Sequence, residues 1–188
     1  MNDRPIAQGS RVTLRPFGPS DVHERYLAWL ADPDVNAYSR RAGTKTSADE
    51  ARTYLASLGK DEHVVGIETD ELGHIGNLKY GPIDRHNQRA DISIVIGERS
   101  AWNRGFGSEA IYLASRHLFE VEGVNRLDAG SANPAFLRMV VRLGWTIEGV
   151  LRERVRIGGQ FHDWTLVALL RREFRAISAY ERNGVQRP

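Results

Sequence analysis

The residues best suited to chemistry lie in a glycine-rich segment near the middle of the chain, Trp102 to Ala110. This segment follows an apolar, strand-like stretch, Ile92 to Ile96, and opens a helical pattern that ends near Phe119. A turn of this kind leaves main-chain N–H groups free at the positive end of the helix dipole. Gly105 and Gly107 let the main chain approach a ligand where a Cβ atom would collide. The segment therefore predicts a phosphate site for a nucleotide-like molecule that carries a pyrophosphate.

Two known patterns fit this segment. Gly105-x-Gly107-x-x-Ala110 satisfies the dinucleotide fingerprint of NAD(P)-dependent oxidoreductases, and Asp128 lies about 20 residues further on, where that fingerprint places an acid. The fingerprint normally opens a doubly wound series of strands, whereas most predicted strands here precede it. The mid-chain position is closer to the acyl-CoA signature of the GNAT acetyltransferases, which the segment also resembles.

Composition limits the classes of function. The 188 residues are predicted to form a single domain, with a core at about 11–174 and a polar tail at 175–188. A net charge of +2 gives no indication of a nucleic-acid or membrane partner. Cysteine is absent, which excludes disulfides and a cysteine nucleophile. No apolar run reaches the ~18 residues of a membrane span, and the start lacks a signal-peptide core, so a cytoplasmic protein is expected.

Hydrophobic periodicity and capping residues predict the elements that position the turn. Helices are expected to begin at an N-cap Ser20, at a capping box formed by Ser47 and Glu50, at the glycine turn, and at Asn133-Pro134. In the third helix Phe106, Ala110, Ala114 and Leu118 form the buried stripe, and in the fourth Leu137, Val140 and Val141 face inward. Residues 1–10 are predicted to be loose. The predicted strands are 12–14, 63–69, 74–80, 90–96, 126–129, 145–157 and 160–170, the last two joined at Gly158-Gly159.

This order of elements resembles the GNAT acetyltransferases from about Arg11 to Phe174. Several segments resemble the ribosomal-protein-alanine N-acetyltransferase branch in particular: Arg11 to Pro16, Asp21, Trp29 to Val35, Ile96 to Glu98, Trp102 to Ala110, Asn133 to Trp145, Glu148-Gly149 and Gly159 to Asp163. The resemblance implies an α+β (mixed α/β) fold with a largely antiparallel seven-stranded mixed sheet and about four flanking helices. It also implies an enzyme that moves an acetyl group from acetyl-CoA to a primary amine by direct attack in a ternary complex, without a metal.

The family comparison also suggests which residues hold the coenzyme. Main-chain groups of the turn are expected to bind its pyrophosphate, and main-chain groups of the preceding strand its pantetheine arm. Asn133 resembles the family asparagine that contacts this arm, although a simple helix cap explains it equally well. The candidate coenzyme-binding residues are Ile94, Val95, Ile96, Arg104, Gly105, Phe106, Gly107, Ser108 and Asn133.

An amine with a pKa of about 10 must lose a proton before it can attack, so a general base is needed. Asp91 is the favoured candidate because it begins the strand beside the expected thioester site. Glu98 and Asp163 compete, and Asp163 lies in the last hairpin, where the branch often has an acid facing the acceptor. Val140 stands where many GNAT enzymes have a catalytic tyrosine, so the usual general acid is missing.

The acceptor stays open between a protein N-terminus and a small-molecule amine such as an amino sugar. Polyamines are disfavoured because the loop from Pro82 to Gln88 holds a single acid, Asp84. Alternatives from other classes are the NAD(P)-dependent oxidoreductase and a GNAT-fold module that binds CoA without catalysis. The sequence also leaves a homodimer open, with Trp29 and Trp164 as candidates for its interface.

Overall fold

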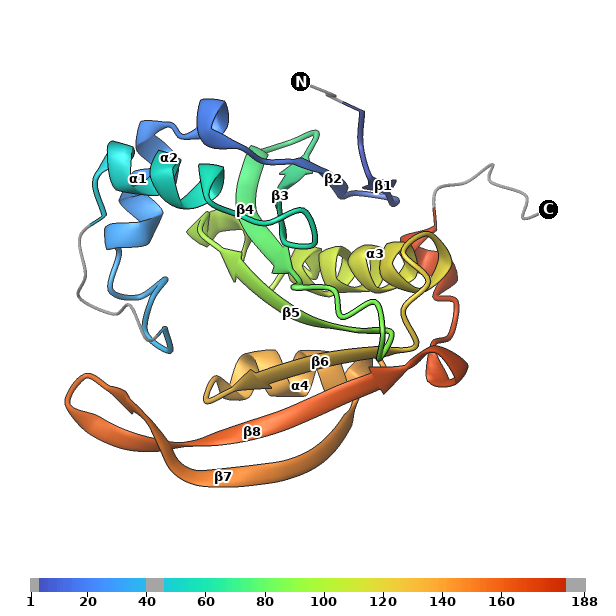
Figure 1. Ribbon diagram of the computed structural model, residues 1–188. Helices are drawn as coiled ribbons and strands as arrows, with labels where there is room; N and C mark the ends of the chain where they lie inside the picture. Colours follow the sequence, from blue (N-terminus) through green and yellow to red (C-terminus); the bar gives the residue numbers. More distant parts are fainter. Residues whose placement is uncertain (1–3, 40–45, 182–188) are drawn as a thin grey trace.

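The computed structural model describes residues 4–39 and 46–181 of the chain. In this part of the protein, eight strands form one sheet in the order β1-β2-β3-β4-β5-β6-β8-β7, with four α-helices around it (Figure 1). The strands are β1 Ala7–Gln8, β2 Thr13–Pro16, β3 His63–Thr69, β4 Gly73–Tyr80, β5 Arg89–Ile96, β6 Arg126–Ser131, β7 Thr146–Ile157 and β8 Gln160–Leu170. The helices are α1 Glu24–Ala31, α2 Ala48–Ala56, α3 Phe106–Glu120 and α4 Pro134–Arg142.

The sheet is antiparallel at every neighbouring pair except one. The exception is β5 with β6, which run parallel and are joined through α3. A doubly wound fold requires a series of parallel pairs, so the dinucleotide interpretation of the glycine turn is wrong. The expected α+β fold with a largely antiparallel sheet is confirmed.

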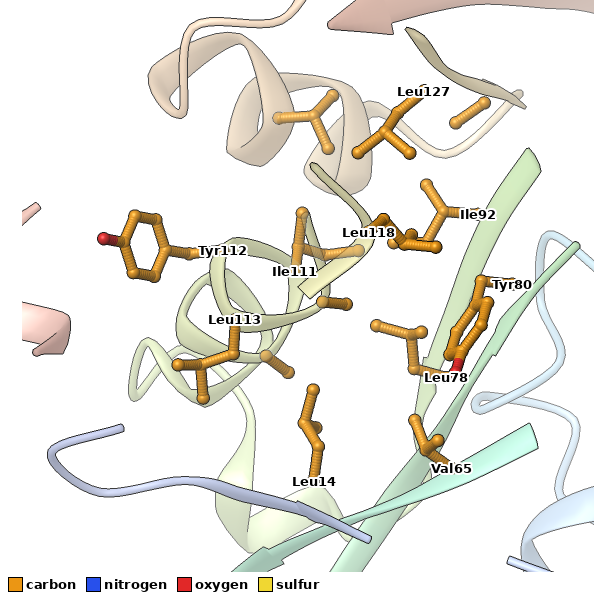
Figure 2. Close-up of a cluster of buried hydrophobic side chains, with 14 of the residues drawn as sticks. Leu14, Val65, Leu78, Tyr80, Ile92, Ile111, Tyr112, Leu113, Leu118 and Leu127 are labelled. Atoms are coloured by element: carbon orange, nitrogen blue, oxygen red, sulfur yellow. The ribbon is translucent and has the colours of Figure 1, made fainter. Parts of the chain in front are cut away.

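The core forms where α3 packs on one face of the sheet. Figure 2 shows Ile111 and Leu118 of the helix beside Leu78 and Ile92 of the strands. The predicted stripe of α3 is confirmed, because Phe106, Ala110, Ala114 and Leu118 are all buried. This packing fixes α3 against the strands whose ends border the glycine turn.

Side-chain caps explain where three of the four helices begin. The Ser47 hydroxyl and the Glu50 carboxylate form the expected capping box of α2, and Asn133 caps α4. The start of α1 was predicted wrongly at Ser20, because Pro19–Asp21 forms a separate 3₁₀ turn and the ring of His23 accepts the N–H of Tyr26 as the cap.

Two further expectations need correction, and the contacts of the two tryptophans considered for an interface are now known. The sheet has eight strands rather than seven, since Ala7–Gln8 pairs with β2 in a segment predicted to be loose. Val141 is 44% exposed rather than inward, whereas Val140 is fully buried. Trp29 and Trp164, considered for an interface, both pack within the chain: a Cβ atom on Gly97 would meet the Trp29 ring, and one on Gly130 would meet Trp164.

Candidate functional site

The parallel strands β5 and β6 separate part of the way along their length. Their pairing covers Arg89–Asp91 against Arg126–Asp128, and beyond Asp128 the strand β6 is bonded to β8 alone among the described residues. Over the same stretch β5 remains bonded to β4. The sheet is therefore split between the second half of β5 and the end of β6, and we call this opening the split.

The main chain of β5 offers hydrogen-bonding groups to the split at alternate residues. Gly81 donates to the Asp91 carbonyl and Gly97 donates to the Ile75 carbonyl, which fixes the alternation of the antiparallel pairing. Val95 is therefore among the residues that exchange bonds with β4, while Ile94 and Ile96 turn their main-chain groups toward the split. The main chains of Ile94 and Ile96 are therefore free to make the expected contact with a ligand, whereas the main chain of Val95 is bonded to β4.

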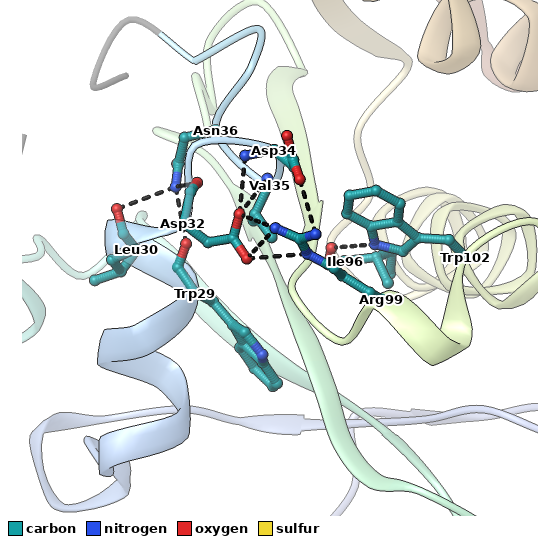
Figure 3. Close-up of polar contacts among 9 residues, drawn as sticks. All are labelled: Trp29, Leu30, Asp32, Asp34, Val35, Asn36, Ile96, Arg99 and Trp102. Carbon is teal, nitrogen blue, oxygen red and sulfur yellow. Dashed lines mark hydrogen bonds and ion pairs between the residues drawn. The ribbon is translucent and has the colours of Figure 1, made fainter. Parts of the chain in front are cut away.

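One of these main-chain groups is already hydrogen-bonded to a tryptophan side chain. The indole Nε1 of Trp102 donates to the Ile96 carbonyl at 2.8 Å (Figure 3). Within the split, the main-chain groups of Ile94 and the N–H of Ile96 are then the ones left for a ligand.

The N-terminus of α3 lies at the same end of β5, since Gly107 adjoins the side chain of Ile96. Its N-cap is Gly105, at a φ of +85°, which favours glycine, and no side chain caps this helix. The N–H groups of Phe106, Gly107 and Ser108 donate to no other main-chain group of the described residues. Three free donors at the positive end of a long helix are suited to a phosphate group.

Gly107 faces helix α4 and the end of β5. A Cβ atom placed on it would make ordinary contacts with Met139 at 3.5 Å and Ile96 at 3.6 Å, without a clash. The turn therefore adjoins both the end of β5 and helix α4. The free donors of α3 and the split therefore lie next to each other.

The remaining candidate residues lie around the turn. Arg104 pairs with Glu71 through both terminal nitrogens and stacks 5.0 Å from the Phe106 ring. Asn133 is occupied through Oδ1 as the cap of α4, and its amide Nδ2 forms none of the hydrogen bonds found in the described residues. Asn133 can thus act as a cap and still offer a donor.

An ion-paired arginine ties the turn to α1. Arg99 donates to both carboxylate oxygens of Asp32 and pairs with Asp34 at 2.8 Å (Figure 3). The same guanidinium lies 6.0 Å from the ring of Trp102. Arg25 of α1 adds a pair with Glu98. These contacts hold the loop before α3 against α1. No sequence motif indicated this arrangement.

Asp91 lies at the closed end of the split, on the face of the sheet opposite α3. Its neighbours Ala90 and Ile92 are buried under α3, and side chains alternate along a strand, so Asp91 points the other way. Desolvation, together with the charge of Asp128, raises the pKa of Asp91, although its side chain is exposed. Asp91 takes part in none of the ion pairs among the described residues, so its carboxylate is available as a base.

Asp163 lies elsewhere and has a local structural partner. Its Oδ1 accepts the N–H of Glu153 at 2.8 Å, and Glu153 has a φ of +51° in a bulge of β7. Leu151, Glu153 and Asp163 line a shallow depression on the β7–β8 hairpin. The third candidate, Glu98, is held by Arg25 and Ser100, and these contacts lower the pKa of its carboxyl.

The described residues lack two further features. They contain no cluster of three or more histidine, aspartate or glutamate side chains placed to hold a metal ion. They also contain no helix that is both long enough and apolar enough to cross a membrane.

Comparison with known proteins agrees with this geometry. A family model described as an acetyltransferase (GNAT) domain matches residues 11–146. The N-acetyltransferase p20 of Bacillus licheniformis is 29% identical over 174 residues, which cover 87% of this chain and 95% of that protein. Human alpha/beta-tubulin-N-acetyltransferase 9 is 21% identical, and the match covers 88% of this chain and 90% of that protein.

A solved structure shows the same fold. The spermidine N-acetyltransferase of Vibrio cholerae, determined in complex with CoA and spermine, superimposes with a TM-score of 0.79 at 20% identity. The match covers 87% of this chain and 97% of that one. The family model spans the split, the glycine turn and α4, and on this basis the chain belongs to the GNAT family of acetyltransferases.

Proposed function

We propose that the protein transfers an acetyl group from acetyl-CoA to a primary amine by direct attack of the amine within a ternary complex. The observation that carries this proposal is the uncapped N-terminus of α3 at the mouth of the split. It joins a phosphate site to a channel edged by free main-chain groups, as an acyl carrier with a diphosphate and a long arm requires.

The coenzyme is bound chiefly by main-chain atoms. The N–H groups of Arg104 to Ser108 face the diphosphate, and Ile94 and Ile96 bind the pantetheine arm. The amide of Asn133 contacts the arm from the opposite edge of the split. These assignments follow from the direction of the β5 main chain and the free donors of α3.

Asp91 is proposed as the general base. A bound ammonium group donates one proton to Asp91, and the freed nitrogen then attacks the thioester carbon, so that a C–N bond forms. The nitrogen loses its second proton to water as the C–S bond breaks, which leaves a neutral amide and a thiolate. The pKa of Asp91, raised by desolvation and by Asp128, makes its carboxylate a better proton acceptor than an ordinary aspartate. Asp163 is the second candidate, acting from the hairpin.

Neither the oxyanion nor the leaving group needs a further acidic side chain. The N–H of Ile94 is the proposed donor to the carbonyl oxygen as it gains negative charge. Val140, in the place of the family tyrosine, is fully buried and carries no proton donor. A thiol has a pKa of about 8.5, so the thiolate leaves readily at neutral pH and takes its proton from water.

The acceptor is proposed to be a protein N-terminal amine, as in the ribosomal-protein-alanine branch, or a small amine such as an amino sugar. The similarity to a spermidine acetyltransferase at 20% identity concerns the fold alone. Spermidine is therefore included in the test as an alternative acceptor. The site of action is proposed to be the cytoplasm.

A panel of amines tests the function. Purified protein is mixed with acetyl-CoA and, separately, with an N-terminal alanine peptide, glucosamine phosphate or spermidine, and release of free thiol is followed. We expect release that depends on one class of amine. Tight binding of CoA with no release from any amine would instead support the module without catalysis, and failure to bind CoA would refute both.

A further inference from the structure

A buried carboxylate lies directly beside the proposed diphosphate site. Glu109, in the first turn of α3, is 0% exposed. Its Oε1 accepts the main-chain N–H groups of Arg11 and Val12 at 2.7 and 3.1 Å and the Ser10 hydroxyl at 3.2 Å. Glu109 therefore fastens the start of β2 to the beginning of α3, a contact between segments about one hundred residues apart.

This carboxylate creates an electrostatic problem for the site. A negative charge within the first turn of a helix is favoured by the helix dipole, but it repels a second anion bound at the same end. A diphosphate on the N–H groups of Phe106 to Ser108 would lie within one helical turn of Glu109. The site therefore needs a cation close to both.

Arg11 meets this requirement. Its Nε donates to Glu109 Oε2 at 3.2 Å, and its Nη1 donates to the Arg104 carbonyl, inside the turn, at 3.0 Å. Its Nη2 lies against the turn, 3.1 Å from where a Cβ atom of Gly105 would be. One guanidinium thus contacts the buried carboxylate and the main chain that forms the phosphate site.

Arg11 also retains capacity for a ligand. Nη2 donates none of the hydrogen bonds found in the described residues, and 46% of the side chain is exposed. The guanidinium carbons of Arg11 and Arg104 each lie 5.0 Å from the centre of the Phe106 ring. Both terminal nitrogens of Arg104 are paired with Glu71, whereas Nη2 of Arg11 has no carboxylate partner among the described residues.

We propose that Arg11 is a positioning residue of the coenzyme site, which neutralises Glu109 and holds the Arg104–Gly105 main chain in the conformation that receives the diphosphate. This inference rests on the proposed function. It adds a side-chain cation from the beginning of the chain to a site otherwise built from main-chain N–H groups.

The test measures CoA binding by titration calorimetry in four variants: R11Q, R11K, E109Q and R11Q/E109Q. R11Q leaves Glu109 without its cation, so CoA should bind about tenfold more weakly, with R11K between R11Q and the wild type. R11Q/E109Q removes both charges and should recover most of the affinity. Added salt should weaken binding less in R11Q than in the wild type, because one cation is missing.

R116Q is the matched control, because Arg116 is an arginine of α3 that pairs with Glu181, away from the turn. Its affinity for CoA should equal that of the wild type. A purely structural role of Arg11 would make the double variant no better than R11Q, with an unchanged salt dependence, and this result would overturn the inference. If the wild type itself bound no CoA, the proposed function would fail instead.

Discussion

At the scale of single residues, the candidate bases differ in their surroundings. Asp91, beside the split, forms no ion pair with any described residue, and its pKa is raised by desolvation and by Asp128. Asp163 accepts a main-chain N–H and supports a bulge in β7. We therefore propose proton transfer for Asp91 and a local structural role for Asp163, and the two roles can be separated by experiment.

Replacing Asp91 by asparagine should lower kcat by about 100-fold, the lower range for loss of a general base, and leave the affinity for CoA unchanged. Steady-state thiol release and CoA titration measure the two quantities. Asp163→Asn is the matched comparison and should retain most of kcat. A larger loss of kcat in Asp163→Asn than in Asp91→Asn would reverse the assignment.

The pH dependence follows from the same carboxyl. Because the base works deprotonated and its pKa is raised, kcat should fall on the acid side at a pH above the ordinary aspartate value of about 3.9. Removing the neighbouring charge in Asp128→Asn should move this fall to lower pH. An unchanged or oppositely shifted profile, recorded with saturating amine, would show that Asp91 does not carry the proton.

At the scale of elements, a pair of histidines joins the start of α1 to β4. His23 Nδ1 accepts the Tyr26 N–H, so its Nε2 carries the proton that faces His74 Nδ1 at 2.9 Å. Burial, followed by the charges of His23, Arg15 and Arg25, lowers the pKa of His74 to about 4. Both rings are therefore neutral in the folded protein at pH 7.

This pair predicts a loss of stability in acid. The unfolded chain protonates His74 near pH 6.5 and the folded chain only near 4, so the free energy of unfolding should decrease as pH falls through this window, by about 3 kcal/mol at most. Urea unfolding of His74→Gln and of the wild type at several pH values measures the difference. His86→Gln, in an exposed loop, is the control. A wild-type slope that persists in His74→Gln would refute this origin.

Local signals were sufficient to predict most elements. The Ser47 and Glu50 pair, Asn133-Pro134 and Gly158-Gly159 each act within a few residues, and the helices and the hairpin begin or turn where they indicate. The strand β1 was missed because residues 1–10 are polar and the strand is held by pairing with β2. The strand β1 depends on a tertiary contact, which hydrophobic periodicity in the sequence does not reveal.

The site was predictable only in part for the same reason. The glycine turn is contiguous, so its residues could be named from the sequence. The contact of Arg11 with Glu109 spans 98 positions, and neither residue alone indicates the other. An acid in the first turn of a helix is explained by the helix dipole alone, so the sequence does not indicate that Glu109 is buried and bonded to the residues just before β2.

At the scale of the whole molecule, one core supports the split. Leu118 is fully buried between α3 and the sheet, whereas Val121, just past the end of the helix, is 70% exposed. Leu118→Ala should cost about 2–5 kcal/mol of unfolding free energy, and Val121→Ala less than about 0.5 kcal/mol. Denaturant unfolding measures both. Equal costs would mean that α3 is not packed as described.

The central claim, that the turn at the start of α3 binds the diphosphate of coenzyme A, is tested most directly by adding a bulky side chain at Gly107. Gly107→Val should fold, since a Cβ atom there meets only ordinary contacts, and it adds bulk beside the N–H groups proposed to bind the diphosphate. Gly59→Val, where a Cβ atom is equally free, is the control. In CoA titrations we predict at least about tenfold weaker binding for Gly107→Val and wild-type binding for Gly59→Val. Wild-type affinity in a folded Gly107→Val protein would contradict the account.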